Sequence, residues 1–160
     1  MGAPVFEGKL IPTTLDKSEI LEQTLEAGGR SFTYSAVSMG NPHCVIYVDE
    51  VAAFPVERFG PLIETHPLFP RRVNVEFVQV LSEGEAIQRT WERGSGETWA
   101  CGTGAAAVAA IGKRLGRTGS KLTLHLTGGD LYLEYPGQGS VFLTGNAVEV
   151  FSGEWDPAAG

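Results

Sequence analysis

The chain has almost no cysteine, and the little it has is not arranged for cross-linking. Cys44 and Cys101 are its two cysteines among 160 residues, and they lie far apart in the sequence. Two isolated thiols exclude a disulfide framework and are typical of a reduced, cytoplasmic protein. No Cys-x-x-Cys or His-x-x-x-His pair occurs, so we expect no metal site.

Long apolar runs and an excess of basic residues are also missing. No run approaches the roughly 18 apolar residues of a membrane span. Residues 1–7 lack the basic start and apolar core of a secretory leader. The chain has 12 basic and 19 acidic residues and a net charge of −7, and an acidic surface repels nucleic-acid phosphates and anionic lipid headgroups. We therefore expect a cytoplasmic protein that binds neither nucleic acid nor membranes.

The chain does contain enough apolar side chains to build a core. Hydrophobic residues make up 42% of it and charged residues 19%, which is typical of a globular protein and not of a disordered one. No repeat or linker divides it. We expect a single domain over residues 1–160, with no internal boundary.

Strand-forming segments separated by Gly- and Pro-containing turns dominate the pattern. A hairpin is expected over residues 20–39 with its turn at Gly28-Gly29, although Ile20–Leu25 is equally compatible with a helix. Pro55 suits the first position of a short helix that continues over 56–65. Further strands are predicted over residues 44–48, 73–80, 86–92, 121–126, 131–135 and 141–151.

One segment differs from the rest, because it is made of small and apolar residues. Residues 105–114 begin with three alanines and end with Lys113-Arg114, which favours a helix with cations at its C-terminal turn. A helix that is apolar on all sides is buried. We therefore predict an α+β fold in which a mostly antiparallel sheet wraps around one central buried helix.

Cys101 stands directly before this helix, between Gly-rich turns. The unpaired N–H groups of a helix start carry partial positive charge, which favours a thiolate and attracts a carboxylate or phosphate. Cys101 is therefore a candidate nucleophile or base. Alternatively, it is a small buried hydrophobic residue, as free cysteines often are.

Gly102-x-Gly104-x-x-Ala107 is similar to a dinucleotide-binding fingerprint. The context does not fit, because no apolar strand leads into it and no acidic residue closes a second strand about 20 positions later. Nucleotide binding is therefore not expected.

A few polar residues near apolar strands are further candidates. Glu92-Arg93 is either a solvated strand end or a clamp for a zwitterion. His43 is either a hydrogen-bonded turn residue or a group that tunes a thiol. Asn74 interrupts a strand, so it caps an edge or reaches into a site. Cys44 is expected to be structural, pointing into the core.

Several blocks of the sequence, in this order, resemble the C-terminal half of diaminopimelate epimerase, and the resemblance covers about residues 1–155. The last block is the most specific of them. The blocks are Gly40-Asn41-Pro42-His43-Cys44-Val45, Pro61-Leu62-Ile63-Glu64, His66-Pro67-Leu68-Phe69-Pro70, Asn74-Val75-Glu76-Phe77 and Trp91-Glu92-Arg93-Gly94-x-Gly96-Glu97-Thr98-x-Ala100-Cys101-Gly102-Thr103-Gly104.

The resemblance implies an enzyme of lysine biosynthesis that inverts an amino-acid α-carbon without pyridoxal phosphate, metal or other cofactor. The family has two similar lobes, each a sheet around a central helix, with the site between them. One cysteine from each lobe flanks the substrate. By this resemblance Cys101 is the proton acceptor, and His43 and Glu92 tune the thiols. The residues that it assigns to substrate binding are Asn41, Asn74, Glu92, Arg93, Gly102 and Thr103.

The partner cysteine of the family is missing from this sequence. The other half of the family carries it in a Cys-Gly-Asn-Gly type segment, and residues 1–6 are similar to the family's mid-chain junction. We therefore expect one lobe that works with an N-terminal partner lobe and is inactive alone. Two alternatives stay open: a non-catalytic interaction module or homodimer, and another two-cysteine isomerase such as a proline racemase or a phenazine-type enzyme. The Glu92-Arg93 pair favours diaminopimelate, which has two polar ends, over proline.

Overall fold

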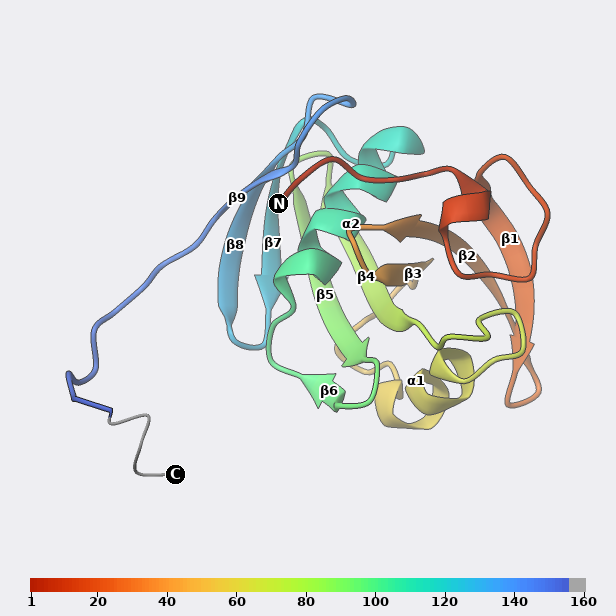
Figure 1. Cartoon of the computed structure of the whole chain (residues 1–160), viewed down its shortest axis with the longest axis horizontal. Coiled ribbons are helices and arrows are strands. Elements are labelled where there is room, and N and C mark those ends of the chain that lie inside the picture. The colour runs from red at the N-terminus through yellow and green to blue at the C-terminus, as the bar shows by residue number, and fades with distance from the viewer. Residues whose placement is uncertain (156–160) are drawn as a thin grey trace.

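The computed structural model describes residues 1–155, which form a curved nine-stranded sheet, two α-helices and one short 3-10 helix, η1 (Gly8–Leu10) (Figure 1). The strands follow the order β1-β2-β3-β4-β5-β7-β8-β9, and the short β6 pairs with β5. The pairs β3/β4 and β5/β7 are parallel, whereas the other six are antiparallel. The strands are β1 (Ile20–Ala27), β2 (Arg30–Ser38), β3 (Pro42–Tyr47), β4 (Asn74–Ser82), β5 (Glu85–Glu92), β6 (Gly96–Thr98), β7 (Lys121–Leu126), β8 (Gly129–Glu134) and β9 (Phe142–Thr144).

Helix α2 (Gly102–Arg114) lies inside the curve of the sheet (Figure 1). Every residue from Gly104 to Gly112 is buried, and aliphatic side chains of β3, β4, β7 and β8 surround them. The small side chains let the helix lie close to its neighbours. A Cβ at Gly112 would come within 2.4 Å of Thr118 Oγ1. The predicted α+β fold, a mostly antiparallel sheet around a central buried helix, is confirmed.

Helix α1 (Val56–Glu64) packs against the opposite face of the sheet. This second core is aromatic: the ring centroids of Phe32 and Phe59 lie 5.0 Å apart. Alternation along β3 separates the two cores, because Cys44 and Ile46 face the aromatic one while Val45 faces α2.

The hairpin over residues 20–39 is confirmed as β1 and β2, so the alternative of a helix at Ile20–Leu25 is wrong. Pro55 precedes the first helical residue of α1 and does not form part of it.

The strand expected over residues 141–151 is largely wrong. Only Phe142–Thr144 forms a strand, and residues 145–155 leave the body as an extended segment (Figure 1). Val150 and Phe151 are exposed there, because β-propensity alone cannot supply a pairing partner. Residues 156–160 of the expected domain lie outside the described part. Among residues 1–155, neither helix has the length and hydropathy that crossing a membrane requires.

Candidate functional site

A group of polar side chains interrupts the aliphatic lining of the sheet beneath the first turn of α2. Side chains two residues apart share a strand face, so polar residues at alternate positions of β4 and β5 collect on the side that faces the helix. All but Glu92 are buried. We call this group the polar cluster, and it consists of His43, Asn74, Glu76, Gln88, Thr90 and Glu92.

Cys101 is the N-cap residue of α2. Its backbone is extended (φ −137°, ψ 107°), and its carbonyl accepts the first helical hydrogen bond, from Ala105 N at 2.9 Å. Its Sγ accepts a hydrogen bond from Gly104 N at 3.4 Å, and the hydroxyl of Thr103 lies 3.6 Å from the sulfur. The sulfur thus takes the position that a Ser or Asp oxygen occupies at an ordinary helix start.

The backbone N–H groups of Gly102 and Thr103 belong to the first turn of α2. N–H groups of a first turn have no acceptor within the helix, so they are donors for an external anion. Gly102 has no side chain to cover them, and both residues are only half-buried. The helix start thereby combines a thiol with donors suited to a carboxylate.

Burial raises the pKa of the Cys101 thiol above its ordinary value, and the carboxylates of Glu76 and Glu92 add to this increase. The hydrogen bonds from Thr103 and Gly104 oppose it. Desolvation and the hydrogen bonds at the helix start therefore shift the thiol pKa of Cys101 in opposite directions. The donors on Thr103 and Gly104 are the groups that favour the thiolate.

Gly104 is required by the close approach of α2 to the polar cluster. A Cβ at this position would lie 2.7 Å from Glu76 Oε1 and 3.1 Å from Gln88 Nε2. Contacts below about 3 Å force a neighbour to move. Glycine here lets Cys101 and the buried carboxylate of Glu76 share one compact site.

His43 and Glu76 form a fully buried pair, in which His43 Nδ1 lies 2.8 Å from Glu76 Oε1. His43 Nε2 lies 3.1 Å from the side-chain oxygen of Asn41. Burial raises the pKa of the Glu76 carboxyl, and the neighbouring His43 opposes that increase. The prediction that His43 sits in a turn is wrong: it is the second residue of β3.

Asn74 lies in the middle of the sheet and not at an edge, because β4 pairs with both β3 and β5. Its amide nitrogen donates to Pro42 O at 3.0 Å, and its oxygen accepts from Arg93 N at 2.9 Å. Asn74 therefore fixes the backbone at Arg93, the second residue of the predicted clamp.

Glu92 and Arg93 do not pair with each other. Glu92 Oε1 accepts a hydrogen bond from Thr98 Oγ1 at 2.6 Å, and the Arg93 guanidinium donates to Arg71 O at 3.1 Å. The structure brings Glu92 within electrostatic range of Cys101, while Arg93 lies at the exposed end of the same segment.

The sequence reasoning did not single out two buried carboxylates, Glu76 and Glu64. Glu76 belongs to the site itself. Glu64, in α1, accepts hydrogen bonds from Trp91 Nε1 at 2.7 Å and Gly94 N at 3.0 Å, and so supports the loop between β5 and β6. The signal for Glu76 was its spacing of two from Asn74, which places both side chains on one strand face.

Cys44 lies away from this site, on the other face of the sheet. It is fully buried in the aromatic core, and burial raises the pKa of its thiol well above the ordinary value. The interpretation of Cys44 as a structural residue agrees with this position. Within residues 1–155, no group of three or more His, Cys, Asp or Glu side chains is placed to hold a metal ion.

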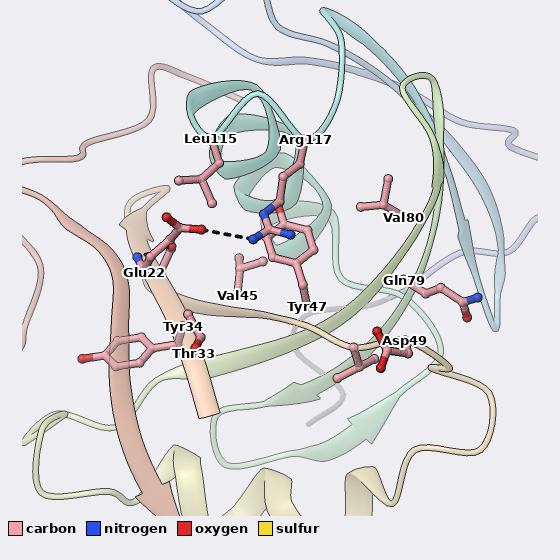
Figure 2. A pocket seen from close by; sticks show the side chains of 12 residues that line it. Glu22, Thr33, Tyr34, Val45, Tyr47, Asp49, Gln79, Val80, Leu115 and Arg117 are labelled. Atoms are coloured by element: carbon pink, nitrogen blue, oxygen red, sulfur yellow. Dashed lines mark hydrogen bonds and ion pairs between the residues drawn. The ribbon is translucent and has the colours of Figure 1, made fainter. Parts of the chain in front are cut away.

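A hollow of about 390 Å³ lies beyond the C-terminal end of α2, among residues of β1 to β4 and the segment after α2 (Figure 2). Arg117 covers the ring of Tyr47 there, 4.5 Å from its centroid, and pairs with Glu22 at 3.1 Å. The hollow is lined by none of the residues that the sequence predicted for the site. The helix start and this hollow are therefore separate features.

Comparison with known proteins identifies the family of this chain. The family model described as diaminopimelate epimerase matches residues 35–150. The diaminopimelate epimerase of Leptospira biflexa is 52% identical over 155 residues, covering 96% of this chain and 55% of the relative. That of Pelotomaculum thermopropionicum is also 52% identical, covering 97% of this chain and 55% of the relative. The chain thus spans about half the length of the curated relatives it matches.

Among solved structures, a probable proline racemase from Agrobacterium radiobacter K84 matches with a TM-score of 0.55 and 17% identity, over 88% of this chain and 52% of that protein. At this identity the likeness concerns the fold alone. The family match over most of the chain and relatives about half identical along nearly all of it show that this chain belongs to the diaminopimelate epimerase family.

Proposed function

We propose that this chain supplies one half of the active site of a cofactor-independent epimerase that acts on diaminopimelate. The observation that carries the proposal is the position of Cys101, whose sulfur caps α2 beside the free N–H groups of its first turn. The relatives named diaminopimelate epimerase support the reaction class and the substrate.

The chemistry requires a proton carrier on each face of the substrate α-carbon. A thiolate removes the α-hydrogen and becomes a thiol, while a second thiol gives its proton to the opposite face and becomes a thiolate. The carbon is inverted and one proton is exchanged. We propose Cys101 as one of the two carriers, with the N–H groups of Gly102 and Thr103 on the α-carboxylate. Fixed dipoles of this kind stabilise the charge that develops in the transition state.

The second carrier must come from outside this chain. Cys44 is excluded by its place in the aromatic core, on the sheet face away from Cys101. The curated relatives are nearly twice as long as the matched region. We therefore propose that residues 1–160 are one lobe, that a second lobe supplies the partner cysteine, and that the isolated chain has negligible epimerase activity.

Recognition of a substrate with two amino-acid ends fits the polar residues around the helix start. We propose that Glu92 binds an ammonium group and Arg93 a carboxylate, and that Asn41, which contacts Thr103 at the helix start, also faces the substrate. Asn74 contributes by holding the backbone of Arg93. Proline has no second polar end, so it would leave this part of the site without partners.

Isotope exchange at the α-carbon tests the proposal. Residues 1–160 would be fused behind the N-terminal half of the Leptospira biflexa relative, and hydrogen loss from diaminopimelate in D₂O followed by mass spectrometry. We expect exchange by the fusion, loss of exchange in its Cys101→Ser variant, and none by the isolated chain. A Cys44→Ala fusion is the matched control and should stay active.

Two outcomes contradict the proposal. The first is two-way exchange by the pure isolated chain, which would show that no second lobe is needed. The second is undiminished exchange by the Cys101→Ser fusion. Exchange of proline, and not of diaminopimelate, would keep the mechanism but overturn the substrate.

A further inference from the structure

An unbroken chain of hydrogen bonds joins the buried pair beneath α2 to the sulfur of Cys101. From Glu76 Oε1 it passes to His43 Nδ1 over 2.8 Å, and from His43 Nε2 to Asn41 Oδ1 over 3.1 Å. It continues from Asn41 Nδ2 to Thr103 Oγ1 over 3.3 Å and reaches the sulfur over 3.6 Å. Strands β3 and β4, the turn before β3 and the first turn of α2 each contribute a residue.

Each link of this hydrogen-bond chain has a single direction when Cys101 is a thiolate. An amide nitrogen can only donate, so the hydroxyl oxygen of Thr103 accepts from Asn41, and its own hydrogen is donated to the sulfur when Cys101 is a thiolate, which can only accept. The amide oxygen of Asn41 can only accept, so His43 Nε2 carries a hydrogen and donates it. Every donor between His43 and Cys101 is therefore aimed towards the sulfur.

Glu76 determines how this series of hydrogen bonds begins. With a hydrogen already on His43 Nε2, a single proton lies between Nδ1 and the carboxylate, on either atom, and the pair is neutral overall. A neutral pair is the form that complete burial favours. Within residues 1–155, the second oxygen of Glu76 is also buried and has no hydrogen-bond partner, so His43 is the side chain that this carboxyl holds.

We propose that Glu76 is a positioning residue: through His43 and Asn41 it directs the hydroxyl of Thr103 onto the sulfur of Cys101. The inference rests on the proposed function only in that it concerns the same sulfur. In this arrangement the side chains of Asn41 and Thr103 direct a hydrogen bond to the sulfur of Cys101, which is a role distinct from binding substrate.

Other charges that face the sulfur must be separated from this effect. Glu76 on β4 and Glu92 on β5 both disfavour the thiolate, while the N–H of Gly104 favours it. His43 reaches the sulfur only through its neighbours. A test must therefore compare variants that carry the same charge at position 76.

The test measures the thiol pKa of Cys101 in the 160-residue chain, in a Cys44→Ala background. Thiolate absorbance at 240 nm and the rate of alkylation by iodoacetamide would be followed against pH. We expect Thr103→Val to move both profiles up by about one pH unit, roughly a tenfold loss of thiolate at fixed pH, because one hydrogen bond is lost. Thr103→Ser retains the hydroxyl and should restore the original profile.

Glu76→Leu and Glu76→Gln are a matched pair, because both remove the charge. The Gln amide can donate to His43 Nδ1 and keep the hydrogen on Nε2, whereas Leu cannot. We expect the Leu variant to have a thiol pKa up to about one unit above that of the Gln variant. When Thr103 is already Val, the two should coincide, because the group through which Glu76 acts is gone.

Three results would overturn the inference: equal profiles for the Leu and Gln variants, a difference that persists in the Thr103→Val background, or no effect of Thr103→Val. Where Glu76→Leu fails to fold, Asn41→Ala takes its place, because Asn41 is only half-buried. In a chain that retains Thr103, Asn41→Ala should raise the thiol pKa of Cys101. In the Thr103→Val background, it should leave that pKa unchanged. These measurements need neither substrate nor a second lobe, so failure of the epimerase proposal would leave them standing.

Discussion

The indole nitrogen of Trp91 donates a 2.7 Å hydrogen bond to Oε2 of Glu64, a carboxylate that is only 5% exposed. The other oxygen of Glu64 accepts from Gly94 N. Helix α1 is thereby attached to the loop between β5 and β6. Because β6 ends at Thr98, which holds Glu92, a helix on one sheet face determines the position of a residue of the site on the other.

Replacing Glu64 with Ala should destabilise the chain by about 2–4 kcal/mol, because the N–H donors of half-buried Trp91 and of Gly94 both lose a charged acceptor. Urea unfolding would measure the change. Arg72 offers the matched control, since it pairs with the same carboxylate but is 59% exposed. Arg72→Ala should cost less than about 1 kcal/mol. Equal losses in the two variants would contradict this view of Glu64.

Glycine at position 104 should be needed for close packing and not for helix flexibility. Gly104→Ala places a Cβ against the buried Glu76 carboxyl and should cost about 1–3 kcal/mol by overpacking, despite the better helix propensity of Ala. Gly102→Ala is the control, because its Cβ would meet neighbours only at 3.8 Å. Equilibrium denaturation of both variants decides the point, and a stabilised Gly104→Ala chain would disprove it.

Arg89 holds two segments through its guanidinium. It forms paired contacts to Glu97 at 2.7 and 3.0 Å and donates to Phe54 O at 2.7 Å. A lysine cannot reproduce this fork. We expect Arg89→Lys to lower the free energy of unfolding by about 1–3 kcal/mol, and a melting temperature equal to wild type would show that the fork is dispensable.

Stability should fall at alkaline pH because the thiol of Cys44 is buried. Its pKa in the folded chain lies well above the ordinary value, chiefly through burial and also through Glu76. The stabilising contribution is present below the unfolded thiol pKa of about 8.5 and is lost as pH rises, by up to about 1.4 kcal/mol per pH unit.

Urea midpoints at pH 7.5, 8.5 and 9.5 would reveal this dependence. The Cys44→Ala variant should lose less stability over the same range, whatever its stability at pH 7.5. Cys101, whose thiol pKa is also raised, leaves a residual slope in both chains. Identical slopes would assign the alkaline loss to groups other than Cys44.

Much of the fold could be predicted because local pattern and tertiary structure agree. The alanines of α2 combine high helix propensity with small size, and the tight approach of the sheet uses both properties. Residues 145–151 had only the pattern of a strand. A strand also requires a partner, and propensity carries no information about whether a neighbouring strand exists.

The residues of the candidate site were predicted less completely than the fold, because a single sequence does not show which polar side chains are buried. A glutamate in a strand or helix usually faces solvent, so a single sequence gives no sign that Glu76 and Glu64 are buried. The position of Cys101 at a helix start was predictable because glycines and an alanine-rich helix follow it. The hydrogen bonds that occupy Asn74 were not, since their partners, Pro42 and Arg93, come from other elements.

The sheet separates two chemically different cores, so the unfolding of each core can be followed with a different probe. Trp91 packs against the aromatic side, so its emission follows the loosening of that interior. Among residues 1–155, the alanine-lined core contains no tryptophan, but the amide hydrogens of α2 exchange with solvent only when the helix opens. If emission and exchange gave different unfolding free energies, the molecule would lose its two halves in succession and not in a single concerted event.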